Sequence, residues 1–180
     1  VYYDKPSGLL DQMASSVGAV VAVDFKSTEA PEISKVEFDL GKYGYSLCII
    51  DSGADHADLT SEYASIPREM KEVAAFFGKE VLREVDKSEF MSSLKALREK
   101  LGNDRAVLRA YHFFNESERA VLETEAIRNG DFDEFLKLVK LSGHSSYMYL
   151  QNVYASSMPM QQAVSLTLPL CGEILGEKGA

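Results

Sequence analysis

Asp11 is the side chain in this sequence whose setting best suits it to chemistry. It follows Gly8-Leu9-Leu10 at the start of a short amphipathic segment, residues 8–18, which leads into an apolar run. The first turn of a helix stabilises an anion by about 0.3–1 kcal/mol. A carboxylate held there can accept a proton from a substrate hydroxyl. An aspartate at a helix start is also often only a solvated charge, and the residues alone leave both interpretations open.

Tyr63 is the second candidate, and it too has two interpretations. Its ring could pack in the core, or its hydroxyl could hydrogen-bond to a sugar. A polar segment at 51–56, DSGADH, directly follows an apolar run, and loops at strand ends often line binding sites. These features predict a site in this region without defining its ligand.

Several other chemistries lack their motifs. The sequence contains neither GxxxxGK[ST] nor GxGxxG, so no loop matches the usual phosphate-binding patterns. The histidines His56, His112 and His144 do not share metal-ligand spacing, and Ser15 and Ser16 are not within a GxSxG elbow. We therefore expect no metal site and no serine hydrolase.

Composition narrows the class of protein further. A net charge of −9 disfavours both a nucleic-acid partner and an anionic membrane surface. No apolar run approaches the roughly 20 residues of a membrane span, and no signal-peptide pattern is seen. Cys48 and Cys171 both lie in apolar stretches, which favours two buried free thiols. A cytoplasmic protein is the default expectation.

Periodicity predicts a few strands followed by helices. Apolar and alternating runs predict strands at 19–25, 35–39 and 44–51. Helical spacing and capping residues predict helices at the following ranges: 8–18, 60–78, 88–101, 104–129, 132–142 and 160–175. This order indicates an α+β fold. Three strands make a thin sheet for so many helices, so we expect the sheet to be incomplete.

The order of these segments resembles galactokinases, which belong to the GHMP family of small-molecule kinases. Residues 6–13, PSGLLDQM, resemble the galactokinase segment PCGIMDQ, and residues 19–25 match the strand that follows it. Residues 47–63, ending in Ser-Glu-Tyr, resemble the family's strand, turn and sugar-contacting tyrosine. Residues 116–142 and 144–154 resemble the helices of its C-terminal region. The resemblance is nearly collinear over the whole chain.

This resemblance implies specific roles. Asp11 falls on the catalytic carboxylate, Gly8 on a glycine that touches the sugar, and Tyr63 on the sugar-contacting tyrosine. The implied reaction transfers the γ-phosphate of ATP, with Mg²⁺, to the anomeric hydroxyl of galactose. Ser7, where many members have Cys, and Pro169, in a helix expected to be Ala-rich, depart from the family pattern.

The resemblance also implies a GHMP-kinase-like fold with a helix-rich C-terminal domain. Residues 1–34 would end the N-terminal kinase domain, and 35–180 would form the C-terminal domain, stopping before its last Gly-rich motif. The family's N-terminal signature, with its catalytic arginine, and its phosphate loop have no counterpart here. We therefore expect the isolated chain to be inactive, and its incomplete sheet edge predicts a homodimer.

Two alternatives stay open. The chain could derive from a kinase for galacturonate, arabinose or N-acetylgalactosamine. It could also derive from a galactokinase-like sensor that binds sugar without turnover.

Overall fold

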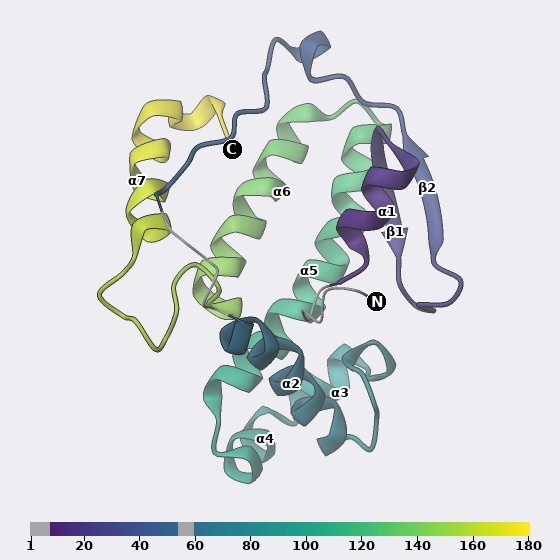
Figure 1. Cartoon of the computed structure of the whole chain (residues 1–180). Helices are drawn as coiled ribbons and strands as arrows, with labels where there is room; N and C mark the ends of the chain where they lie inside the picture. Colours follow the sequence, from purple (N-terminus) through teal and green to yellow (C-terminus); the bar gives the residue numbers. More distant parts are fainter. Residues whose placement is uncertain (1–7, 54–59) are drawn as a thin grey trace.

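The computed structural model describes residues 8–53 and 60–180 (Figure 1). Within these ranges the chain is helix-rich with one small antiparallel sheet, which confirms the α+β expectation at that level. The helices are α1 (Leu10–Val17), α2 (Thr60–Phe76), α3 (Lys87–Ser92), α4 (Leu94–Leu101), α5 (Asp104–Arg128), α6 (Phe132–Ser145) and α7 (Ala163–Leu175). The strands are β1 (Val20–Asp24) and β2 (Glu32–Val36). Four single turns complete the order: η1 (Leu40–Tyr43), η2 (Leu82–Glu84), η3 (Ser146–Leu150) and η4 (Gly176–Lys178).

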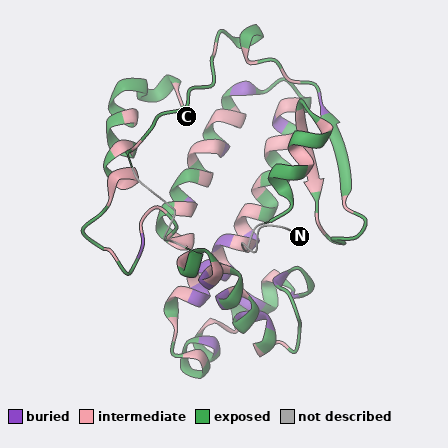
Figure 2. Cartoon of the chain, viewed as in Figure 1, coloured by how far each residue is buried: buried purple, intermediate pink, exposed green. Residues whose placement is uncertain are grey.

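The main core lies where α2, α3, α4 and the first half of α5 meet, and the buried segments of Figure 2 gather there. Val73, Phe90 and Leu97 are completely buried in it. Two of the helices around this core, α3 and α5, begin at capping side chains. Asp86 accepts hydrogen bonds from two backbone N–H groups of α3, and Asn103 accepts one from α5.

Helices α5 and α6 lie side by side as a helical hairpin (Figure 1). Its turn was predicted correctly: Gly130 adopts a left-handed conformation, and Asp131 caps α6 by accepting from the Glu134 N–H. At this end of α6, the ring of Tyr43 stacks on that of Phe132 with centroids 4.4 Å apart. Aromatic packing thereby ties the segment after β2 to the start of α6.

The β1–β2 hairpin packs against α5, with Val20 opposite Val36 and Asp24 opposite Glu32. Polar contacts hold it in place. Arg128 of α5 donates to Ser34 Oγ at 3.1 Å, and Arg83 of η2 pairs with Asp24 at 2.8 Å. The hairpin and the preceding α1 thus lie along one side of the long helix (Figure 1).

The prediction of a strand over 44–51 was wrong. Residues 45–53 form no secondary structure, and the side chains of Leu47 and Ile49 are 83% and 96% exposed. A strand requires a hydrogen-bonded neighbour, and no described segment pairs with this one. For the same reason Cys48 is an exposed free thiol, whereas it was expected to be buried. Cys171, in α7 (Ala163–Leu175), was also expected to be buried and is partly exposed.

Other element boundaries also differ from expectation. The second strand is 32–36 rather than 35–39, and the helix predicted over 88–101 divides at Ser93 into α3 and α4. Pro67 lies within α2 without interrupting it. None of the helices in the described ranges is both long enough and apolar enough to cross a bilayer.

Candidate sugar-binding site

Asp11 lies in the first turn of α1, as predicted, and its side chain is exposed. The N-cap residue, Leu9, makes no side-chain hydrogen bond to the first backbone N–H groups of α1. Asp11 is the acidic residue in the first turn of this helix. Gly8 lies just before the helix, and a Cβ at this position would meet no atom within 4 Å. Both predicted residues are therefore open to a ligand.

Tyr63 lies in the first turns of α2, with 44% of its surface exposed, and it lines a cavity of about 620 Å³. One wall of the cavity is the α2 face that carries Glu62, Tyr63 and Ile66. The opposite wall is formed by residues 151–155 and by later residues up to 166. Neither Gly8 nor Asp11 lines this cavity, so the structure does not bring all three predicted residues into one pocket. Ser7 and His56, which also fall within the matched segments, lie outside the described residues.

Glu62 joins the two walls of the cavity. Its carboxylate accepts from Ser157 N–H at 3.1 Å and Ser157 Oγ at 2.9 Å, and also from Ser156 Oγ. Burial favours the neutral acid, but these hydrogen bonds outweigh it and hold the pKa of Glu62 below its usual value. Glu62 is therefore an ionised structural group whose oxygens are already occupied.

A buried ionic network lies behind the cavity. Glu69 of α2 and Arg109 of α5 are each only 2% exposed, and Arg109 Nη1 lies 2.8 Å from Glu69 Oε2. Arg105 also bonds both oxygens of Glu69. Burial favours the neutral acid, but the two guanidinium groups outweigh it and lower the pKa of Glu69. For Arg109, burial dominates and lowers its pKa.

Arg109 was not among the residues singled out from sequence, although the pattern contains a signal for it. Six charged or titratable residues recur along α5 at alternating spacings of four and three, which places them on one helix face: Arg105, Arg109, His112, Glu116, Arg119 and Glu123. The structure turns this face toward partners on α2, α6 and η3. His112 Nδ1, for example, lies 2.9 Å from Ser145 Oγ.

The described residues do not fit Mg²⁺ or the phosphates of ATP. No group of three His, Cys, Asp or Glu side chains among them is arranged to hold a metal ion. The sequence also lacks a phosphate-binding loop pattern. We therefore derive no chemical step through Mg-ATP for this chain.

Comparison with known proteins shows which kind of protein this chain is similar to. No protein-family model matches the chain. It is 32% identical to the galactokinase of Thermotoga petrophila over 81% of its own length and 38% of that protein. It is 32% identical to the galactokinase of Actinobacillus pleuropneumoniae serotype 5b, over 69% of the chain and 31% of the relative. For the galactokinase of Bos taurus the identity is 31%, over 93% of the chain and 40% of the relative.

The chain thus spans between 31% and 40% of the length of these relatives. The matches come from distant organisms, and the longest covers nearly all of this chain. The chain is therefore similar in sequence to a part of these galactokinases.

Proposed function

We propose that this chain forms part of a galactokinase-like enzyme, which transfers the γ-phosphate of ATP to the anomeric hydroxyl of galactose. The observation that carries this proposal is the similarity to galactokinases of two bacteria and a mammal, which extends over 69–93% of the chain. ATP and Mg²⁺ would be bound mainly by elements outside this chain.

Asp11 is the proposed base. Its exposure at the start of α1 lets a sugar hydroxyl reach it. The open space beside Gly8 would let the sugar approach the backbone. The Tyr63 hydroxyl would bond a sugar oxygen from the α2 side. This arrangement requires one sugar to contact both α1 and α2.

The proposed division of the fold follows the same similarity. Residues 1–34 would belong to the N-terminal kinase domain and 35–180 to the C-terminal domain of a GHMP-type fold. The proposed boundary falls within β2, so the β1–β2 hairpin would contain residues of both domains. We also propose a cytoplasmic location and a homodimer. Light scattering of the purified chain tests the homodimer directly. A monomeric mass would overturn the dimer.

The cavity beside Tyr63 favours an uncharged sugar. Its two charged lining residues are Glu62 and Arg109, and both are already paired. A sugar carboxylate would find no free cation among the lining residues that the structure describes. Galactose therefore fits this cavity better than galacturonate does.

The test uses the protein extended to the length of its relatives. Asp11→Asn should lower the rate of galactose-dependent ADP release by roughly 10²- to 10⁴-fold, because a positioned base is lost. Asp133→Asn is the matched control, since Asp133 is also exposed in the first turn of a helix. Undiminished turnover by Asp11→Asn would remove Asp11 from catalysis. A wild-type protein that binds galactose without turnover would indicate a sensor instead.

A further inference from the structure

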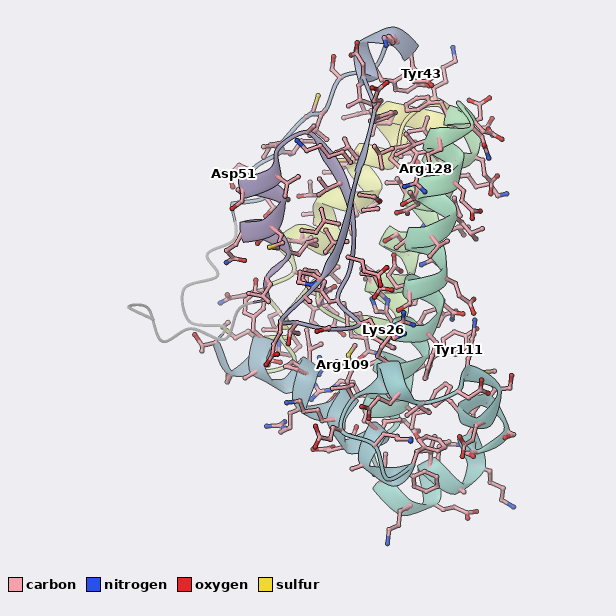
Figure 3. The ribbon with its side chains drawn as sticks, turned by 90° about the vertical axis from the view of Figure 1, so that its right-hand side faces the viewer. Lys26, Tyr43, Asp51, Arg109, Tyr111 and Arg128 are labelled. Atoms are coloured by element: carbon pink, nitrogen blue, oxygen red, sulfur yellow. The ribbon has the colours of Figure 1, made fainter. Side chains whose placement is uncertain are left out.

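Arg109 connects both walls of the Tyr63 cavity from a buried position on α5. Toward α2, its Nη1 donates to Ser65 Oγ at 2.9 Å and to Glu69 Oε2 at 2.8 Å. Toward the opposite wall, its Nε donates to the Leu150 carbonyl oxygen at 3.0 Å. Figure 3 shows the side chain at the junction of α2 and α5.

The contact with Leu150 falls where the chain changes direction. Leu150 ends η3, and Gln151 adopts a left-handed conformation with φ 56°, which residues other than glycine rarely do. A carbonyl at the end of a helix lacks an intrahelical partner, and Arg109 supplies one. Arg109 thereby determines where residues 151–155, the far wall of the cavity, begin.

The contact with Ser65 reaches the helix turn that carries Tyr63. Ser65 Oγ also donates to the Glu62 carbonyl at 2.6 Å, so Arg109 is linked through one hydroxyl to the first turn of α2. Glu62 in turn holds Ser156 and Ser157, which directly follow the far wall in the sequence. Two links thus join the cavity walls, one through Glu62 and one through Ser65 and Arg109. Tyr63 lies between Glu62 and Ser65 in the sequence of α2.

We propose that Arg109 is a positioning residue, which sets the separation between Tyr63 and the 151–155 wall through Ser65 and Leu150 and so determines the affinity for the sugar. This role rests on the proposed sugar-binding function of Tyr63. Arg109 would act through its neighbours, because its side chain is only 2% exposed and its guanidinium is already held by Ser65, Glu69 and the Leu150 carbonyl.

The experiment measures galactose dissociation constants of the 180-residue chain by ligand-observed NMR titration. Arg109→Lys keeps the charge but loses the planar set of donors, so it cannot hold both walls. We expect Arg109→Lys and Tyr63→Phe each to weaken binding by about tenfold, and the double variant to weaken it by much less than the product of the two. Arg98→Lys is the matched control, because Arg98 is an exposed arginine that does not line the cavity, and it should bind galactose as the wild type does.

Backbone hydrogen exchange, measured on the same variants without sugar, separates the two proposals. Arg109→Lys should accelerate exchange in residues 150–157 selectively, whereas Arg98→Lys should not. If the wild-type chain binds no galactose but this local effect appears, the sugar site fails and the positioning of the walls stands. Unchanged exchange in 150–157, or independent affinity losses in the double variant, would overturn the role of Arg109.

Discussion

Removal of the Glu69 carboxylate is the sharpest test of the buried network. In Glu69→Ala, Arg109 remains 2% exposed and loses its ionic partner, while Arg105, with 31% of its side chain exposed, can turn toward water. Breaking one side of a buried pair costs about 3–5 kcal/mol, mainly because an uncompensated charge stays buried. That is a large fraction of the roughly 5–15 kcal/mol that stabilises an ordinary domain.

Urea unfolding followed by far-UV circular dichroism measures this cost. With a slope of about 2 kcal/mol per molar urea, Glu69→Ala should lower the midpoint by about 1.5–2.5 M. The double replacement Glu69→Met with Arg109→Met removes both charges and should recover most of that loss. Arg98→Met is the surface control, because Arg98 pairs with Asp104 in an exposed position, and it should leave the midpoint unchanged.

A shift of less than about 0.3 M for Glu69→Ala would refute the reasoning, because it would mean that Arg109 finds water or another partner without cost. A double variant as unstable as the single one would also contradict it. In that case lost packing, rather than an unpaired charge, would explain the effect.

Three further outcomes are expected. Burial lowers the pKa of His112 from its usual 6.5, although Glu116 opposes this. The contribution of the neutral ring to the free energy of unfolding is therefore fully present above pH 6.5 and is lost as the pH falls below that value. Thermal unfolding between about pH 7.5 and 5.5 should show this loss in the wild type and less of it in His112→Asn. Phe132→Ala removes the ring that stacks on Tyr43 and should lower the free energy of unfolding by about 3 kcal/mol in urea titrations, whereas an unchanged midpoint would mean that the aromatic cluster contributes nothing. Galacturonate should bind the chain more weakly than galactose in NMR titrations, and equal affinity would contradict the absence of a free cation among the described residues that line the cavity.

The helices were largely predictable from the sequence because their signals are local. The Asn129-Gly130 turn, the Asp131 cap and the apolar spacing of α2 each depend on residues within about four positions. The first strand was predictable for a similar reason, since a short Val-rich run favours extended backbone. The roles of Asp11, Gly8 and Tyr63 came from the resemblance to galactokinases and stay predictions.

The strand prediction at 44–51 failed because a strand-like sequence pattern does not by itself supply the neighbouring strand that a sheet requires. Leu47, Ile49 and the residues around them form an apolar run like that of a buried strand, yet pairing depends on a neighbour that lies far away in the sequence. The role of Arg109 was missed for the same reason, because it depends on contacts between segments that are distant in the sequence. Its charge and spacing are visible in the sequence, but whether an arginine is solvated or buried depends on what packs over it.

By itself the sequence determined the positions of the helices, the α1–β1 order that presents Asp11, and the relation to galactokinases. The tertiary structure alone decided which charges are buried together and which walls enclose Tyr63. The physical reason is distance along the chain. The partners of Arg109 lie 40–44 residues away, and only the packing of α2 and η3 against α5 brings them within hydrogen-bond reach.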